Sequence, residues 1–106
     1  MRLRILSAAV EDLHSGRLFY ERQGEGIGEY FFNALFSDID SLVLYAGVHQ
    51  KVFRYHRLLS KRFPYAVYYT IEKDMEKDFV VVWRVLGLRR NPRGLSHALE
   101  HGSART

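Results

Sequence analysis

The stretch 57–92 constrains the fold more than any other part of this 106-residue chain. Apolar and aromatic residues recur there and just before it in three runs, 52–63, 66–71 and 79–88, and the charged run 72–78 separates the last two. Runs of β-branched and aromatic residues between turn signals are typical of strands. Pro64 follows the first run, and its missing N–H suits a strand start or a turn. The sequence therefore predicts an antiparallel meander of three strands.

The first of these runs alternates between apolar and polar residues, so its two faces can be predicted. One parity is apolar and forms the expected core face, with the side chains Phe53, Tyr55, Leu59 and Phe63. The other parity forms the expected polar outer face, with the side chains Arg54, His56, Ser60 and Arg62.

The last run is almost continuously apolar, which predicts a central strand that is covered on both faces for part of its length. Arg84 is the exception within it. A buried arginine requires an ion-pair partner, and we expect an acidic residue of the first helix to supply it.

Two amphipathic helices are predicted in the N-terminal half, after a short strand at residues 2–6. Ser7 is the expected N-cap of the first helix, which should span about 8–23. The second helix should span about 29–45, because apolar residues recur along it at helical spacing. Three glycines at 24, 26 and 28 separate the two helices. No strand precedes these glycines and no Gly-Lys-Ser/Thr follows them, so a helical hairpin bend is favoured over a phosphate-binding loop.

Charge is unevenly distributed along the chain, whose net charge is +4. Residues 1–50 carry four Lys/Arg and seven Asp/Glu, a net charge of −3, whereas residues 51–106 carry twelve and five, a net charge of +7. A basic half fits either an acidic partner, such as nucleic acid or an acidic protein segment, or a solvated basic face. There is no cysteine, and no apolar run reaches the roughly 20 residues of a membrane span. We therefore expect a cytoplasmic protein without disulfides.

The predicted element order is one strand, two helices and then three strands. This order predicts an α+β fold, in which an N-terminal strand and a two-helix hairpin pack on an antiparallel sheet with a C-terminal three-strand meander. Because no linker or internal repeat is present, residues 1–106 are interpreted as a single domain. Its tail is expected to be partly flexible from about residue 93.

Short segments along nearly the whole chain resemble one known family. They are SAAVEDL at 7–13, Tyr20 with Gln23, Gly28-Glu29, Phe32 with Leu35, RLL at 57–59, RFPY at 62–65, VYY at 67–69 and RRNP at 89–92. In this order they are similar to the RelE/ParE superfamily of bacterial type II toxins, the plasmid-stabilisation toxins. The most specific part is Arg-Phe-Pro-Tyr followed by Val-Tyr-Tyr.

The resemblance implies a small cytoplasmic toxin that a cognate antitoxin neutralises by wrapping it with an extended or helical segment. RelE-like members cut mRNA in the ribosomal A site, and ParE-like members act against DNA gyrase. RelE-like ribonucleases place one arginine in the second strand of the meander, another after the last strand, and commonly a tyrosine in the tail. These positions are Ala66, Arg89 and Leu95 here, and Gly87 or Leu88 stands where the family often has a histidine.

With one of three positions matched, the resemblance favours a ParE-like toxin that binds a macromolecular target such as gyrase. A RelE-like, ribosome-dependent mRNA endonuclease remains an alternative, and so does a non-toxic module that binds nucleic acid or an antitoxin. In the ribonuclease case the reaction would be independent of a metal, and no cofactor or metal site is expected.

The candidate functional residues are mainly cations expected at one end of the meander. The catalytic candidates, should the protein be an enzyme, are His56, Arg89 and Arg90. The residues predicted to contact the target or nucleic acid are Arg54, Arg57, Arg62, Arg89 and Arg90. The residues predicted to contact the antitoxin are Phe31, Phe36 and Tyr45 as apolar anchors, and Arg57 and Arg62, with Arg89, as partners of carboxylates. Without an antitoxin, the same apolar residues would suit a homodimer.

Overall fold

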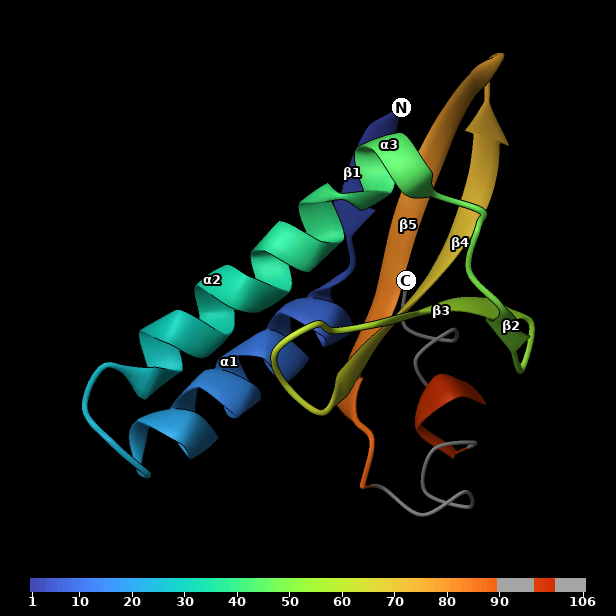
Figure 1. Cartoon of the computed structure of the whole chain (residues 1–106). Coiled ribbons are helices and arrows are strands. Elements are labelled where there is room, and N and C mark those ends of the chain that lie inside the picture. The colour runs from blue at the N-terminus through green and yellow to red at the C-terminus, as the bar shows by residue number, and fades with distance from the viewer. Residues whose placement is uncertain (90–96, 101–106) are drawn as a thin grey trace.

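The computed structural model describes residues 1–89 and 97–100, in which it forms five strands and three helices (Figure 1). In chain order they are β1 (Arg2–Ile5), α1 (Ser7–Glu21), α2 (Ile27–Asp40), α3 (Leu42–Tyr45), β2 (Lys51–Val52), β3 (Tyr55–Leu59), β4 (Tyr65–Asp74) and β5 (Lys77–Gly87). Residues 97–100 add one further helical turn. Arg90, Leu95 and most of the predicted tail lie outside the described residues.

The strands form one mixed sheet in the order β1-β5-β4-β3-β2. The antiparallel meander of β3, β4 and β5 is as predicted. β1 joins it in parallel beside β5, with Leu3 opposite Val80, and periodicity alone does not reveal this direction. β5 therefore lies in the interior of the sheet, and Val80, Val82 and Val85 along it are buried. The prediction of a central last strand is confirmed.

Residues 52–63, predicted as the first strand of the meander, instead form a short hairpin followed by a loop. β2 ends at Val52, and Phe53 and Arg54 form a turn with φ of 52° and 74°. Positive φ at both turn residues matches the tight turns that join two twisted antiparallel strands. β3 then begins at Tyr55. The sequence does not signal this turn, because the turn residues include neither glycine nor asparagine.

The two faces of β3 are also the reverse of the prediction. His56 and Leu58 lie opposite Tyr69 and Val67, whose side chains belong to the core beneath the helices. Tyr55 instead belongs to a buried cluster on the other face of the sheet. The predicted alternation of the two faces is present. Both faces of this strand are partly covered, however, so hydrophobicity alone could not tell which face meets the helices.

β4 and β5 continue through the charged run 72–78, which was expected to be a connection. They remain paired to Asp74 opposite Lys77, and Met75 and Glu76 form the turn with φ of 50° and 69°. The tip of this hairpin extends past the ends of the neighbouring strands (Figure 1). Exposed charged residues are compatible with a strand when both of its faces are in water.

The glycine-rich segment is the bend of a helical hairpin, as predicted. Glu21, the last residue of α1, accepts hydrogen bonds from the backbone N–H groups of Gly26 (3.1 Å) and Gly28 (2.9 Å) at the start of α2. These bonds lower the pKa of the Glu21 carboxyl and satisfy N–H groups that an anion would otherwise bind. Gly16 brings the helices close together, since a Cβ there would lie 2.5 Å from the Phe31 ring.

The helix boundaries differ from the prediction at two points. Ser7 is the first residue of α1 and makes no capping bond, because Leu6 occupies the N-cap position. The second predicted helix is divided at Ser41, whose hydroxyl donates to the carbonyl of Asp38 (2.6 Å). This bond takes a carbonyl near the end of α2 and marks the step into the short α3.

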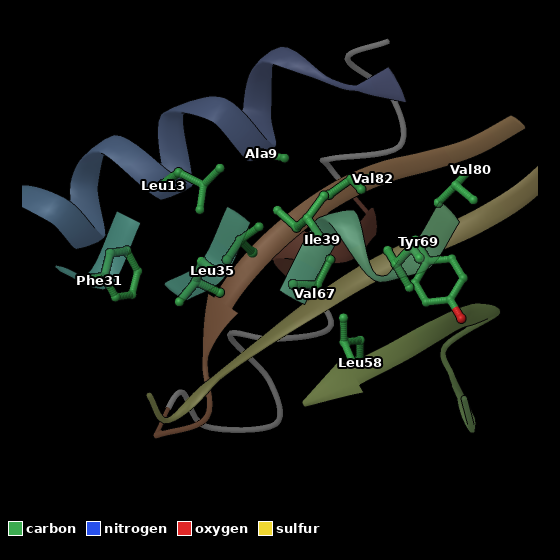
Figure 2. Close-up of a cluster of buried hydrophobic side chains, with 12 residues drawn as sticks. Ala9, Leu13, Phe31, Leu35, Ile39, Leu58, Val67, Tyr69, Val80 and Val82 are labelled. Carbon is green, nitrogen blue, oxygen red and sulfur yellow. The ribbon is translucent and has the colours of Figure 1, made fainter. Parts of the chain in front are cut away.

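The main core lies between the helical hairpin and one face of the sheet (Figure 2). Its helical side includes Leu13, Leu35 and Ile39, each at most 1% exposed. A smaller cluster lies on the opposite face, where the turn at 97–100 covers the sheet (Figure 1). The residues of this opposite-face cluster are Tyr55, Ala66, Tyr68, Leu86, Ala98 and Leu99.

Arg84 links the two sides of the sheet through Asp12 of α1. The two side chains form a bidentate ion pair with N···O distances of 2.7 and 2.8 Å, as the sequence predicted for an acidic residue of the first helix. Asp12 also accepts the N–H of Val85 (2.9 Å), and Arg84 also donates to the carbonyl of Ala98 (3.0 Å). The hydrogen bonds to the carboxylate raise the pKa of Arg84, which stays charged. One ion pair thus joins α1, β5 and the C-terminal turn.

Candidate functional site

Aromatic side chains gather where β4 begins and β5 ends. The ring of Tyr20, from α1, lies 5.0 Å from the ring of Phe31 and 4.8 Å from that of Phe63, between ring centroids. Phe31 in turn lies 4.9 Å from Tyr65. Stacked and edge-to-face contacts of this kind stabilise a cluster beyond the burial of its area. They hold the end of α1 and the start of α2 against this end of the sheet.

A hollow of about 320 Å³ opens beside this aromatic cluster, and we call it the strand-exit hollow. The backbone N–H of Leu88 donates to the carbonyl of Pro64 (2.8 Å), which places Arg89 at the rim. Burial raises the pKa of the Tyr20 hydroxyl, and the positive charge of Arg89 partly offsets this rise. The residues that line the strand-exit hollow are Phe19, Tyr20, Gln23, Pro64, Tyr65, Gly87 and Arg89.

A second hollow, of about 370 Å³, lies along α2 and the loop between β3 and β4. Arg62 lines it and donates to the hydroxyl of Tyr30 (3.1 Å), with its guanidinium carbon 5.8 Å from the centre of that ring. Asp38 also lines it, but its carboxylate is buried and accepts a hydrogen bond from Ser60 (2.7 Å). We call this second hollow the α2 hollow. Lys61 is a second cation that lines it.

The two hollows lie at the same end of the sheet, because Phe63 contacts both Tyr20 and Tyr30. Within the described residues, neither Arg62 nor Arg89 forms an ion pair. Available guanidinium groups beside apolar walls suit an acidic segment that also carries apolar side chains. The two hollows thus place available cations beside apolar walls at one end of the sheet.

Arg90 lies outside the described residues. The remaining predicted cations, His56, Arg54 and Arg57, lie elsewhere, so the expectation that all of the cations gather at one end does not hold. His56 pairs with Tyr69, four residues along β4 from Tyr65, which corresponds to about 13 Å at roughly 3.3 Å per residue. Arg54 lies in the β2–β3 turn. Arg57 pairs with Tyr68, which belongs to the opposite-face cluster.

Burial raises the pKa of the Tyr68 hydroxyl, and the Arg57 guanidinium partly offsets the rise. The Arg57 side chain therefore interacts with the buried Tyr68 hydroxyl and is only partly accessible. His56 is half-buried, and its Nδ1–H donates to the carbonyl of His49 (2.9 Å). The prediction of a solvated His56 on an outer face was therefore wrong.

The predicted antitoxin contacts change once burial is known. Phe31 is 0% exposed and forms part of the core, so it cannot anchor a partner. The helical spacing of apolar residues did not show that Phe31 is buried more deeply than its neighbour Phe32. Phe36 is partly buried and packs against Phe32 (4.8 Å between centroids). Tyr45 is 58% exposed and remains a candidate anchor.

Sequence reasoning missed several exposed apolar residues that a partner could contact. Phe19 on α1 is 54% exposed, and Leu44 and Val48, on either side of Tyr45, are 79% and 75% exposed. A signal for Phe19 was available, since it lies beside the apolar stripe that continues through Leu13 to Tyr20. No comparable signal existed for Val48, which follows the end of α3.

No helix in residues 1–89 and 97–100 is long and apolar enough to cross a membrane. The same residues contain no group of three or more side chains that could hold a metal ion.

The structure has a close likeness in a known toxin–antitoxin system. A chain of the chromosomal ParDE TA system from P. aeruginosa superposes with a TM-score of 0.69 at 16% sequence identity, over 84% of this chain and 97% of that chain. The chain has the RelE/ParE toxin fold. This confirms the fold that the sequence resemblance predicted. No protein-family model matches the sequence, and no curated protein matches it either.

Proposed function

We propose that the protein is the toxin of a type II toxin–antitoxin pair and is ParE-like, arresting growth by binding a cytoplasmic macromolecular target such as DNA gyrase. One observation carries the proposal, namely that its fold matches a chain of a ParDE system over nearly the whole length of both chains. The early resemblance in short motifs points independently to the same superfamily.

The opposite face of the sheet supports a ParE-like toxin over a ribonuclease. The place where RelE-like members have an arginine is Ala66, which is 0% exposed and lies in the opposite-face cluster with Leu86 and Leu99. Metal-free cleavage of RNA requires accessible groups that move protons and stabilise charge at the phosphate. Among the described residues of this face, Tyr55 and Tyr68 are buried and Arg57 is only partly accessible, while His56 belongs to the other face.

Expression tests the proposal directly. Induction in a bacterial host should arrest growth, and co-expression of the open reading frame next to its gene should restore growth. Purified protein should inhibit supercoiling by gyrase, whereas primer extension on abundant mRNAs should show no new cuts. Codon-positioned cuts would establish the ribonuclease instead. Normal growth at confirmed expression would point to a module that only binds.

The antitoxin contacts can be tested separately, since charge and geometry favour an acidic segment across the two hollows. We propose that Arg62 and Arg89 pair with carboxylates of the antitoxin, and that Tyr45 and Phe36 contribute apolar area. Replacing both arginines with alanine should weaken binding by at least tenfold, with a steeper loss at low salt. Arg54→Ala is the matched control, because it removes an exposed cation from another part of the sheet. Equal affinity of the double variant and the control would contradict the charge contribution.

Exposed apolar residues around α3 also support a homodimer in the absence of an antitoxin. Leu44 and Val48 are the most exposed of them. Light scattering over a range of concentrations would show a dimer that Leu44→Asp abolishes. A monomer at all concentrations would mean that this surface needs a different partner.

A further inference from the structure

Two histidines and a tyrosine fasten the connection between α3 and β2 onto the sheet. The connection consists of residues 46–50, and it contains Gly47, with φ of 97°, and His49. The backbone N–H of Gly47 donates to the hydroxyl oxygen of Tyr69 on β4 (2.9 Å). The Nδ1 atom of His49 lies 2.5 Å from the same oxygen. Tyr69 is 0% exposed, and its ring belongs to the main core.

The hydrogen bonds around Tyr69 decide which nitrogen of His49 carries the proton. The N–H groups of Gly47 and His49 both act on the Tyr69 oxygen and partly offset the rise in its pKa that burial causes. The hydroxyl oxygen accepts the N–H of Gly47, and its own proton needs an acceptor, for which His49 Nδ1 is the atom within hydrogen-bond distance. It therefore donates to His49 Nδ1, which must be unprotonated. The neutral ring carries its proton on Nε2.

His56 makes this arrangement less tolerant of a second positive charge. Its ring stacks on that of Tyr69, with centroids 5.1 Å apart, and its Nδ1–H donates to the carbonyl of His49. Lys51 of β2 lies opposite His56 in the strand register. Burial and the repulsion from His56 both lower the pKa of His49 below its ordinary value of 6.5, and no carboxylate contributes to that shift.

We propose that His49 is a pH-sensitive latch, which holds the connection 46–50 on β4 while its ring is neutral and releases it when the ring is protonated. Protonation would place an N–H on Nδ1, so the Tyr69 hydroxyl would lose its acceptor and this bond would be lost. The connection that would be released follows α3 directly and carries Val48. Acid would therefore move one of the most exposed apolar side chains, whatever the target of the protein.

The direction of the effect follows from proton linkage. The unfolded chain protonates His49 near its ordinary pKa of 6.5, whereas the folded chain resists protonation until a lower pH. Below pH 6.5 the unfolded or released state therefore binds more protons, and the stability of the latched state falls as the pH falls. Above pH 6.5 both states are neutral at His49, and the latch contributes fully.

NMR titration of the five histidines tests the proposal in the intact chain. The His49 signal, assigned by its loss in His49→Asn, should titrate below pH 6.5. The amide of Gly47 should lose protection from hydrogen exchange over the same interval, while the amide of Val82 in the core keeps it. A His49 pKa at or above 6.5, or unchanged protection of Gly47, would overturn the latch.

Variants separate the latch from a general acid effect. His49→Asn keeps an acceptor near the δ position but does not titrate, so protection of Gly47 should become independent of pH. His14→Asn is the matched control, because His14 is exposed on α1, and it should retain the response of the wild type. Tyr69→Phe should raise the pKa of His49 towards its ordinary value. If His49→Asn lost protection in acid like the wild type, the response would belong to another group and the proposal would fail.

Discussion

The two faces of the sheet are covered in very different ways. α1 and α2, with 15 and 14 residues, cover one face, and the described cover of the other is the single helical turn at 97–100. The helix face is held mainly by apolar burial. The turn combines apolar contacts with two hydrogen bonds to its backbone, from Arg84 to Ala98 and from the Tyr55 hydroxyl to the carbonyl of Leu99 (3.3 Å). We infer that a long amphipathic helix can be positioned by its apolar stripe, whereas a single turn also needs polar anchors.

The largest expected loss is on the helix face. Leu35→Ala should lower the free energy of unfolding by about 4 kcal/mol, because this 0% exposed side chain would leave a cavity between two rigid layers. Chemical denaturation at neutral pH measures the change. Leu44→Ala is the matched control on α3, and its 79% exposure predicts a change within about 0.5 kcal/mol. Similar losses in the two variants would mean that the apolar face of α2 does not carry the core.

The difference between the faces also explains what the sequence could predict. The helical hairpin, the central β5 and the meander follow from periods of 3.6 and 2 that persist over many residues. The partner of Arg84 followed from the cost of burying a charge. The parallel direction of β1 could not be derived, because the periodicity of a strand does not encode the direction of its neighbour.

Local errors arose where the backbone departs from the usual sequence signals. Both hairpin turns use residues without the usual turn preference, Phe53-Arg54 and Met75-Glu76, all with positive φ. Such turns normally contain glycine or asparagine, so neither could be recognised. The hidden turn at Phe53 also made residues 52–63 look like one long strand with a polar outer face.

The candidate site was predictable in part for a similar reason. Arg62 and Arg89 lie near each other because each follows a strand that finishes at the same end of the sheet, and their contact with a partner stays a prediction. His56 was misplaced, because the face that a polar residue occupies depends on tertiary contacts such as its stacking on Tyr69. Phe31 was taken for an anchor because consecutive aromatic residues on a helix do not show which one points inward.

A smaller but more informative loss is expected at the ion pair that connects the two faces. Asp12→Asn keeps an oxygen for the N–H of Val85 but removes the charge that Arg84 needs. Stability should fall by about 3 kcal/mol, the lower end for a broken buried pair, since both side chains keep 13–17% exposure. Glu11→Gln removes the neighbouring exposed carboxylate and should cost far less. Equal losses would show that Arg84 responds to the net charge of α1 and not to its bonds with Asp12.

The smallest of the three effects is expected on the opposite face, and it tests whether the helical turn is part of the cooperative fold. Leu99 is 1% exposed, but its neighbours belong to one turn and a sheet that can close together after its removal. Leu99→Ala should therefore cost about 2 kcal/mol, the low end for a buried leucine. The fluorescence of Trp83, which packs against this cluster, should change in the same denaturation transition as the far-UV circular dichroism. If the fluorescence changed first, the turn would open as a separate unit, and Leu99→Ala would then lower the midpoint of that early step while the main transition, set by the helix face, stayed where it is in the wild type.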